Sequence, residues 1–282
     1  MTSAATPPSV VGVIGGGRMG AGIAQSFAAA GSRVVVVERD GATAADALER
    51  IATGLRRAGG APESAVPGTV TAVSTVAELP PDAELVVEAV PENAVLKAEL
   101  LAAAEGVVTD TCVLATNTSS LSVTELSTAL TRPGRFLGMH FFNPVPVSGL
   151  VELVLAPGTT STTLAAAIGW TRVLGKEEVV VQDSPGFASS RLGLALGLEA
   201  IRMVEEGVAD PEAIDTAMRL GYRHPMGPLR LTDVVGLDVR LAIAEHLHAT
   251  LGERFAPPRL LREKVARGEL GRKTGQGFYR WQ

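Results

Sequence analysis

The 282-residue sequence has little of several residue types on which whole classes of protein depend. It contains one cysteine, Cys112, so no disulfide can form within the chain, and a buried thiol in the apolar segment TCVLAT is the simplest interpretation. It has no excess of basic residues: the net charge of -5 argues against a general nucleic-acid or membrane surface. No apolar run approaches the roughly twenty residues of a membrane-spanning helix.

The N-terminus also lacks the features of a targeting segment. The first nine residues, MTSAATPPS, have neither the basic region nor the apolar region of a signal peptide. We interpret them as a frayed tail ahead of the first strand. Together with the single cysteine, this predicts a protein of the reducing cytoplasm. We predict no metal site.

Glycine, in contrast, is abundant, with 31 residues, and its most informative cluster lies near the N-terminus. Residues 10–38 read VVGVIGGGRMGAGIAQSFAAAGSRVVVVE, which predicts a strand, a Gly-rich turn, a helix and a second strand. Gly15 allows the tight bend, Gly17 lets the backbone approach a pyrophosphate, and Gly20 lets the helix pack closely on the strand. The stretch therefore predicts a dinucleotide-binding unit.

The residues of this stretch also predict which dinucleotide is bound. Glu38 ends the second strand, where a carboxylate can accept both hydroxyls of the adenosine ribose and would repel a 2′-phosphate, so NAD is favoured over NADP. Arg39 could bind a 2′-phosphate, but beside Glu38 we interpret it as flanking the adenine or as solvated. The start of the helix supplies unpaired N–H groups that can bind the phosphates of the dinucleotide. The predicted contacts to NAD are Gly15, Gly16, Gly17, Arg18, Met19, Gly20, Glu38 and Arg39.

The pattern of the chain changes once along its length. Strand-like segments at 69–74, 84–90, 111–115, 136–142, 150–155 and 178–181 alternate with helix patterns at 42–57, 94–104, 122–130 and 163–174. Such alternation predicts a parallel, doubly wound sheet of the Rossmann type. Beyond DSPGF, at 183–187, only helix patterns remain, at 188–206, 211–219, 231–251 and 258–267. We predict an α/β domain over 1–184 and an all-α domain over 185–282.

Polar residues follow several of the predicted strands. Glu92, Asn117 and Ser119 come, like Glu38, at the carboxyl ends of strands, where ligands bind in sheets of this kind. Shortly afterwards, the run SVTE at 122–125 fits a capping box that opens the next helix. We therefore expect the binding site at this edge of the sheet.

Histidine is scarce, and one of its four positions suggests chemistry. His140 lies near the end of a predicted strand, just before a break at Asn143. Glu152 lies in the apolar strand LVELVL, where a carboxylate is costly unless it is paired. If the two strands are neighbours, Glu152 can orient the imidazole and raise its basicity; a structural partner for the carboxylate is equally possible. The other histidines fit turn, surface or packing positions: His224, His246 and His248.

Motifs along nearly the whole chain resemble those of the 3-hydroxyacyl-CoA dehydrogenase family, two-domain NAD enzymes of fatty-acid β-oxidation and of bacterial 3-hydroxybutyryl-CoA metabolism. The shared motifs are VGVIGGGRMGAGIAQ, VVEAVPEN, ATNTSSLSVTEL, GMHFFNPVPV, LVELV, DSPGF, HPMGPLRLTDVVGLD and GRKTGQGFY. Their number and order make the resemblance specific.

The resemblance implies a role for particular residues. His140 corresponds to the general base that takes the proton of the substrate's C3 hydroxyl while hydride leaves C3 for the nicotinamide, and Glu152 to its orienting partner. Ser119 corresponds to a hydrogen-bond donor to the substrate oxygen, and Asn143 to a contact of both nicotinamide and substrate. Further family contacts to the cofactor fall on Glu92, Lys97 and Lys273. The helical domain corresponds to a dimerisation surface, so the resemblance implies a homodimer.

Two departures from the family pattern concern the substrate. The family's PGFxxNR motif is PGFASSR here, so that Ser190 replaces an asparagine that reaches the substrate near its carbonyl. The family's helical hairpin, which carries a serine and a lysine for coenzyme A, shrinks here to LERIATGLRRAGGAPESAVPG. Arg56 or Arg57 could replace the lysine. Drift in an ordinary enzyme is one interpretation of both departures.

A second interpretation is a changed carrier. The substrate would then be a hydroxyacyl, such as glyceryl, thioester of an acyl carrier protein, as in the family branch that makes hydroxymalonyl or methoxymalonyl extender units for polyketides. An acidic carrier protein would require a basic patch, for which Arg50, Arg56 and Arg57 are candidates.

Two further alternatives have less support. A free hydroxyacid dehydrogenase of the β-hydroxyacid type needs a lysine base in its helical domain, yet no lysine occurs between Lys176 and Lys264. A structural or cofactor-sensing protein, like the lens crystallins related to this family, predicts loss of the acid–base pair, yet His140 and Glu152 are both present. An NAD-dependent dehydrogenase of short 3-hydroxyacyl thioesters remains the leading hypothesis.

Overall fold

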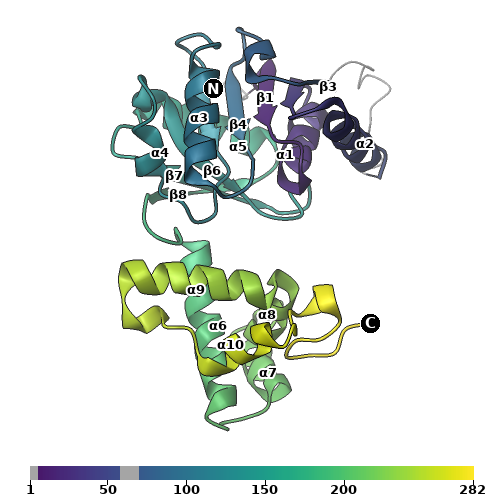
Figure 1. The fold of residues 1–282 in the computed structure, drawn as a ribbon, viewed down its shortest axis with the longest axis vertical. Coiled ribbons are helices and arrows are strands. Elements are labelled where there is room, and N and C mark those ends of the chain that lie inside the picture. Colours follow the sequence, from purple (N-terminus) through teal and green to yellow (C-terminus); the bar gives the residue numbers. More distant parts are fainter. Residues whose placement is uncertain (1–5, 58–69) are drawn as a thin grey trace. The chain divides into compact units, whose positions relative to one another are not determined.

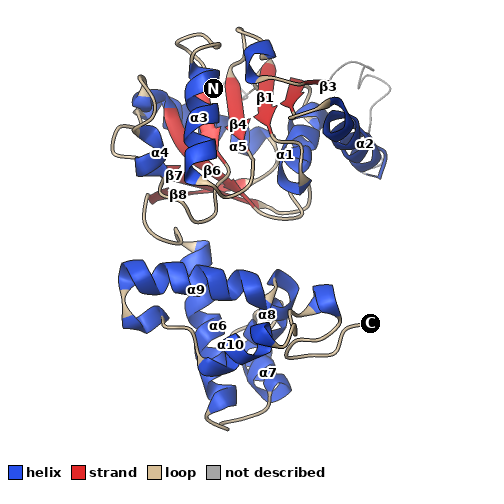
Figure 2. Cartoon of the chain, in the orientation of Figure 1, coloured by secondary structure: helices blue, strands red, loops and turns tan. Residues whose placement is uncertain are grey.

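The computed structural model of the protein describes residues 6–57 and 70–282. The chain divides into two compact units, Met1–Ser184 and Pro185–Gln282. The first holds a sheet covered by helices, and the second holds helices and loops (Figures 1 and 2). The start of the predicted N-terminal tail and the segment AGGAPESAVPG lie outside the described residues.

The first unit is built on one eight-stranded sheet with the strand order β3-β2-β1-β4-β5-β6-β7-β8. Each predicted strand is present within two residues of its predicted ends. The strands are β1 (Val10–Ile14), β2 (Arg33–Val37), β3 (Val70–Val73), β4 (Leu85–Glu88), β5 (Val113–Thr116), β6 (Phe136–Phe141), β7 (Leu150–Leu155) and β8 (Glu177–Gln182).

The direction of the last two strands differs from the prediction of an all-parallel sheet. Strands β1 to β6 are parallel, but β7 pairs antiparallel with β6, and β8 runs parallel to β7. The reason is the connection between β6 and β7, residues 142–149, because a parallel crossover needs about a dozen residues or more. The short connection therefore turns the chain back along β6.

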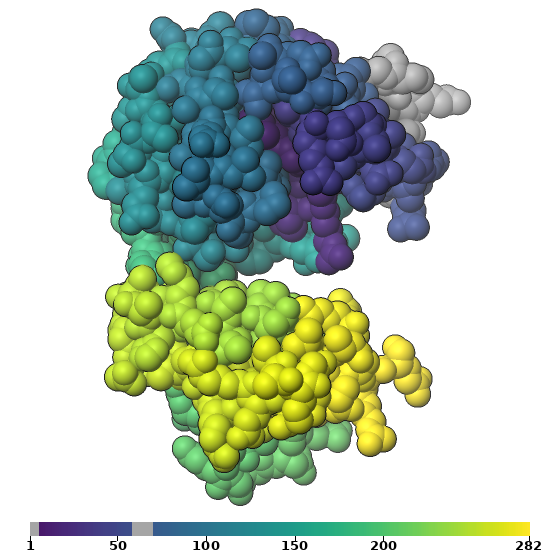
Figure 3. Space-filling model, in the orientation of Figure 1, coloured from purple at the N-terminus to yellow at the C-terminus, as the bar shows by residue number. Residues whose placement is uncertain are grey.

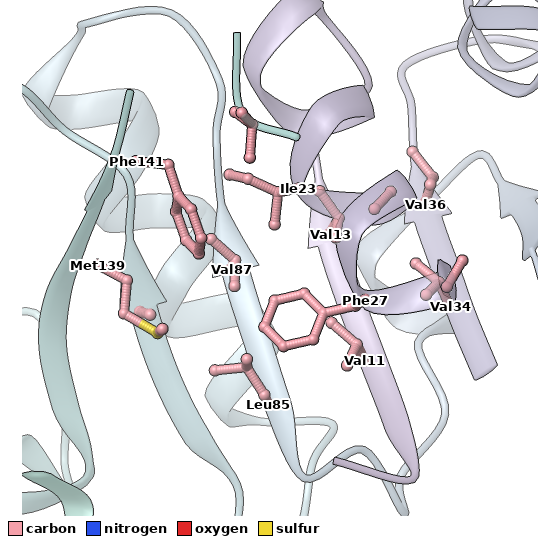
Figure 4. Close-up of a cluster of buried hydrophobic side chains, with 14 of the residues drawn as sticks. Val11, Val13, Ile23, Phe27, Val34, Val36, Leu85, Val87, Met139 and Phe141 are labelled. Atoms are coloured by element: carbon pink, nitrogen blue, oxygen red, sulfur yellow. The ribbon is translucent and has the colours of Figure 1, made fainter. Parts of the chain in front are cut away.

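Helices cover both faces of the sheet. Alternate residues of the strands, such as Val11, Val13, Leu85 and Val87, point toward Phe27 of α1 (Figure 4). This core also includes side chains of α2 and α5, whereas Val123 of α4 packs near Gly138 on the opposite face. The helices of this unit are α1 (Arg18–Ala29), α2 (Gly41–Arg57), α3 (Ala94–Glu105), α4 (Val123–Ser127) and α5 (Ser161–Val173), with 3-10 turns η1 (Val76–Glu78) and η2 (Pro133–Arg135).

Two predictions about local structure in this unit have a definite outcome. The side chain of Ser122 accepts a hydrogen bond from the N–H of Glu125, so it caps α4 as predicted, but the helix ends at Ser127 rather than at residue 130. Cys112 is buried, and burial raises the pKa of its thiol to about 12. The thiol is therefore a core side chain, in agreement with the sequence interpretation.

The second unit packs its helices around a separate apolar core. The predicted helix over 231–251 is wrong in one respect: Gly236, at φ +107°, divides it into α8 and α9. The elements are α6 (Ser189–Glu205), α7 (Pro211–Gly221), α8 (Pro228–Val235), α9 (Leu237–Leu251), η3 (Glu253–Phe255), α10 (Arg259–Ala266) and η4 (Arg272–Thr274). No helix within residues 6–57 and 70–282 combines the length and the apolar character needed to span a membrane.

Candidate active site

The Gly-rich turn has the geometry that its sequence predicts. Gly15 has φ +94°, a conformation that side-chain-bearing residues rarely adopt. A Cβ at Gly20 would lie 1.7 Å from the carbonyl oxygen of Gly15, so only glycine lets α1 approach the turn this closely. A Cβ at Gly17 would meet nothing within 4 Å, so the turn opens there to a ligand. No side chain caps α1, and its first turn has no acidic residue, which leaves its N–H groups available to an anion.

Glu38 lies where the sequence predicts the ribose contact, just past the end of β2. Its Oε1 accepts a hydrogen bond from the N–H of Gly16 at 2.6 Å, which ties the carboxylate to the turn. The neighbouring Arg39 forms an ion pair with Asp40 at 3.3 Å and is largely exposed. The arginine is thus oriented by Asp40, and a role for it in phosphate binding gains no support from this geometry.

A buried ionic network lies beneath the carboxyl ends of β4 and β5. Lys97, which is 1% exposed, donates to Glu88 Oε1 at 2.7 Å and to the carbonyl oxygen of Val90 at 3.0 Å. The other oxygen of Glu88 accepts from Thr116 Oγ1 at 2.6 Å. Because each ion has several partners, the network offsets part of the cost of desolvation. Its position favours a positioning role for Lys97 rather than the direct cofactor contact that the resemblance implies.

Glu92 connects this network to the candidate substrate site. Its Oε2 lies 3.5 Å from Lys97 Nζ, and its Oε1 accepts from the N–H and the hydroxyl of Ser119, at 2.7 and 3.0 Å. Thr118 also donates to both oxygens of Glu92. Glu92 therefore holds the loop after β5 in place, with Ser119 half-buried at its surface.

The antiparallel pairing of β6 and β7 brings His140 and Glu152 together. The two residues are directly opposite in the register, and His140 Nδ1 lies 2.8 Å from Glu152 Oε2. The carboxylate is 1% exposed and the histidine 6%. The contact that the sequence left open is thus present. A carboxylate facing Nδ1 favours the tautomer with its proton on that nitrogen, so the lone pair is on Nε2.

Asn143 lies on the exposed loop that follows β6. A buried lysine on the other side, Lys176, fixes this loop by donating to the carbonyl oxygens of Val145 and Ser148, both at 2.6 Å. Burial lowers the pKa of Lys176. Asn117 accepts from the N–H of Phe141 at 2.9 Å and so joins the ends of β5 and β6. These contacts fix the backbone that follows His140.

Two of the predicted site residues belong to the second unit. Ser190 lies in the first turn of α6 and is half-buried. Lys273 lies in η4, and its Nζ is 2.5 Å from Asp238 Oδ2. Burial opposes ionisation of Asp238, but the hydrogen bond and charge of Lys273 together with backbone hydrogen bonds outweigh it and lower the pKa of the carboxyl. The predicted contacts of Ser190 with substrate and of Lys273 with cofactor stay predictions.

Sequence reasoning missed the residues that support this site from below. Glu88, Thr116 and Thr118 orient Lys97 and Glu92, and Lys176 holds the loop of Asn143. The signal for Glu88 was present, since it is a carboxylate at the end of the apolar run LVVE and resembles the case of Glu152. Lys176 offered no such signal because its partners are backbone carbonyls of a distant loop.

Comparison with known proteins identifies the family. Residues 10–184 match the family model described as 3-hydroxyacyl-CoA dehydrogenase, NAD binding domain, and residues 186–281 match 3-hydroxyacyl-CoA dehydrogenase, C-terminal domain. The chain belongs to the 3-hydroxyacyl-CoA dehydrogenase family. The predicted Rossmann-type fold, NAD as cofactor and an oxidoreductase of this family are thereby confirmed.

Relatives of known name align with this family member over almost their whole length. A probable 3-hydroxybutyryl-CoA dehydrogenase of Bacillus subtilis is 42% identical over 276 residues, which are 96% of each chain. The mitochondrial hydroxyacyl-coenzyme A dehydrogenase of Sus scrofa is 40% identical over 285 residues, covering 96% of this chain and 91% of that protein. Among solved structures, the (S)-3-hydroxybutyryl-CoA dehydrogenase of Ralstonia eutropha has a TM-score of 0.91 at 39% identity, with 98% and 99% of the two chains covered.

Proposed function

We propose that this enzyme interconverts short 3-hydroxyacyl-CoA thioesters and their 3-oxoacyl forms with NAD, and that His140 is its acid–base group. The observation that carries the proposal is the buried pair of His140 and Glu152, 2.8 Å apart, at the carboxyl edge of a sheet that opens on a dinucleotide-binding turn. The names of the relatives, above all 3-hydroxybutyryl-CoA dehydrogenase, support a short acyl chain.

The proton moves through His140. In the oxidative direction, Nε2 takes the proton of the C3 hydroxyl as the C3 carbon loses hydride and becomes a carbonyl carbon. Glu152 stabilises the imidazolium that forms and keeps the ring in one tautomer. In the reductive direction, the imidazolium returns the proton to the carbonyl oxygen. The proposed oxygen ligand is Ser119, whose hydroxyl is oriented by Glu92.

The residues present fit an NAD molecule. The open turn at Gly17 and the uncapped start of α1 would hold the pyrophosphate, and Glu38 would hold the adenosine ribose. When bound, the nicotinamide accepts or supplies the hydride. Asn143 would orient the ring and the substrate, and Lys273 would add a cofactor contact from the helical unit. Ser190 would contact the thioester with one donor and a shorter reach than an asparagine.

The carrier of the acyl group is coenzyme A in this proposal. The same chemistry on an acyl carrier protein would need a basic docking patch on the surface of α2. Arg56, a candidate for that patch, is engaged by Glu49 at 2.9 Å and by Thr53 at 2.8 Å. This pairing offsets the charge of one of the three candidate arginines, and the names of the relatives support coenzyme A as the carrier.

We also propose that the enzyme is a homodimer formed through its helical unit. Several large apolar side chains of that unit are exposed in the single chain, among them Leu192, Leu220 and Tyr222 at 70%, 74% and 75%. Exposed apolar residues of this size favour burial against a partner surface. Sedimentation of the purified protein at micromolar concentration should give a mass of two chains.

The test of the function is the oxidation of NADH, followed by its absorbance at neutral pH, with acetoacetyl-CoA as substrate. We expect rapid turnover by the wild-type enzyme and a loss of kcat of about 10²- to 10⁴-fold in His140→Gln. A matched control is His246→Gln, at a partly buried position of α9, which should leave kcat unchanged.

The outcomes separate the alternatives. No turnover of acetoacetyl-CoA, combined with turnover of an acetoacetyl thioester of an acyl carrier protein, would replace coenzyme A by the protein carrier. No turnover of either substrate, with NADH binding intact in calorimetry, would overturn the proposed reaction. Equal activity of His140→Gln and the wild type would exclude the acid–base role.

A further inference from the structure

A surface cavity of about 270 Å³ lies beside α1 in the first unit. Arg18 and Gln25 of α1, Arg50 of α2 and Asn143 supply its polar groups, and the loop 144–146 supplies an apolar wall. Figure 3 shows α1 and α2 side by side on the surface of this unit. Since Asn143 also belongs to the proposed reaction centre, the cavity adjoins that centre.

The cavity is positively charged in a protein whose net charge is -5. None of its nine lining residues is acidic, and two of them are arginines. Within residues 6–57 and 70–282, Arg18 has no carboxylate partner. Arg50 lies 3.8 Å from Asp46, a weak pairing that leaves the side chain of Arg50 53% exposed. Two guanidinium groups without close carboxylates favour an anionic ligand.

The walls of the cavity are held in place by contacts behind them. Arg50 Nη1 donates to the carbonyl oxygen of Gly16 at 3.2 Å, so the guanidinium is anchored to the Gly-rich turn. A Cβ at Gly22 would lie 2.8 Å from the Cβ of Val145, so the loop packs directly on α1. Lys176 holds the carbonyl oxygen of Val145 from the other side. A fixed arrangement loses little freedom when a ligand binds.

We propose that this cavity binds the phosphate groups of the coenzyme A moiety of the substrate, with Arg18 and Arg50 as their cationic partners. The inference rests on the proposed function, because it requires a coenzyme A thioester at the neighbouring reaction centre. A planar guanidinium donates two parallel hydrogen bonds to a phosphate, and the amide of Gln25 adds a further donor.

The pyrophosphate of NAD has the same chemistry as the ligand that we propose, so the test must distinguish the two. The substrates are acetoacetyl-CoA and the acetoacetyl thioester of N-acetylcysteamine, which carries no phosphate. The variants are Arg18→Gln, Arg50→Gln and the double variant. Arg33→Gln is the matched control, because it removes the same charge from the same unit at an exposed arginine that does not line the cavity.

We expect the double variant to raise the KM for acetoacetyl-CoA by about 10-fold, with smaller increases in the single variants. In Arg50→Gln, the KM for NADH, kcat, and kcat/KM for the N-acetylcysteamine thioester should stay within about twofold of the wild type. Because Arg18 is also a predicted NAD contact, Arg18→Gln is judged by the ratio of kcat/KM for acetoacetyl-CoA to kcat/KM for the N-acetylcysteamine thioester, which should fall. Added salt should raise the KM for acetoacetyl-CoA in the wild type more than in the double variant. Arg33→Gln should behave as the wild type.

Other results would overturn the proposal. A rise in the KM for NADH alone would assign the arginines to the dinucleotide, and an equal loss with both thioesters would assign them to the structure of the turn. Calorimetric titration of free coenzyme A separates this inference from the reaction. If the wild type binds coenzyme A without turning over acetoacetyl-CoA and the double variant binds it more weakly, the proposed coenzyme A site is supported while the proposed reaction fails. Equal binding of coenzyme A by the two proteins would overturn the proposed site.

Discussion

Two buried acidic residues of the sheet unit are paired with a histidine or a lysine, whereas two buried aspartates of the helical unit hold the end of the chain in place. In the sheet unit, Glu152 faces the titratable ring of His140, and Glu88 faces Lys97. In the helical unit, Asp233 is as deeply buried, at 1% exposed, yet it accepts hydrogen bonds from the N–H groups of Phe278 and Tyr279.

Asp215 repeats the pattern of Asp233. It accepts from the N–H groups of Leu229 and Arg230 at the start of α8, and from the hydroxyl of Tyr279 at 2.8 Å. Burial and this hydrogen bond raise the pKa of Tyr279. Arg230 also lies over the rings of Tyr279 and Trp281, at 5.1 and 4.8 Å from their centres. A carboxylate satisfied by backbone donors fixes structure, whereas one paired with a histidine can take part in proton transfer.

The largest effect that this comparison predicts is on turnover. Glu152→Gln keeps the shape of the side chain but removes its charge and its preference for one tautomer of His140. We expect kcat to fall by about 10²-fold or more, with NADH affinity unchanged in calorimetry. The pH profile of kcat should also move. A residue that only positioned the ring would leave that profile unchanged. A variant whose KM rises while kcat and its pH profile stay constant would remove the contrast between the two units.

The second effect is on folding of the helical unit. Asp233→Asn replaces an acceptor oxygen by an amide NH2 group that faces N–H donors. One of these donors is Trp281 Nε1, which lies 2.8 Å from Asp233 Oδ2. We expect the free energy of unfolding to fall by about 2 to 5 kcal/mol in urea titrations. Asp210→Asn is the control, since asparagine caps a helix as well as aspartate does and Asp210 caps α7 from an exposed position. Equal stability of the two variants would contradict a structural role for Asp233.

A smaller effect concerns Lys176, a buried charge of the sheet unit whose partners are backbone carbonyls. Lys176→Met leaves the carbonyl oxygens of Val145 and Ser148 without their donor, which should cost about 1 to 3 kcal/mol of stability. Burial lowers its pKa below the ordinary value of 10.5, so the unfolded chain binds more protons between the two pKa values. The contribution of Lys176 to stability therefore rises with pH up to about 10.5. The same rise in the Lys176→Met variant would assign it to another group.

The smallest effects are expected from two further carboxylates, the buried Glu105 of the sheet unit and the partly exposed Glu269 of the helical unit. Hydrogen bonds and charge from Arg267 and Lys264 lower the pKa of Glu269 from 4.5 to about 2. Burial opposes ionisation of Glu105, but hydrogen bonds from Thr131 and the N–H of Arg132 outweigh it and lower its pKa. Both contributions are fully present above about pH 4.5 and are lost as the pH falls through the folded-state values.

Acid titration of two variants tests this prediction. Glu105→Gln should flatten the loss of stability below pH 4.5, and Glu269→Gln should flatten it at lower pH, toward 2. Melting temperatures recorded between pH 2 and pH 6 measure both. Curves that coincide with that of the wild type would show that other carboxylates govern acid unfolding.

The sequence by itself determined the strands, most helices and the dinucleotide-binding turn. These features depend on local rules: the spacing of Gly15, Gly17 and Gly20, the apolar runs of the buried strands, and the serine that caps α4. They can be predicted from the sequence because each residue's conformation is restricted by its neighbours in the chain. The division of the predicted helix at Gly236 shows the limit, since an apolar pattern continues across a residue whose φ is positive.

The tertiary structure alone decided how the site is assembled. In the sequence, Glu152 is a carboxylate without an evident partner. In the structure, the short connection after β6 makes β7 antiparallel, which places Glu152 opposite His140. No signal in the sequence indicated the contacts of Lys176 with the 145–148 loop or of Arg50 with Gly16, because these partners are backbone carbonyls of segments far away in the chain. Contacts of this kind depend on strand order and register, which arise from the packing of the whole sheet rather than from any one segment.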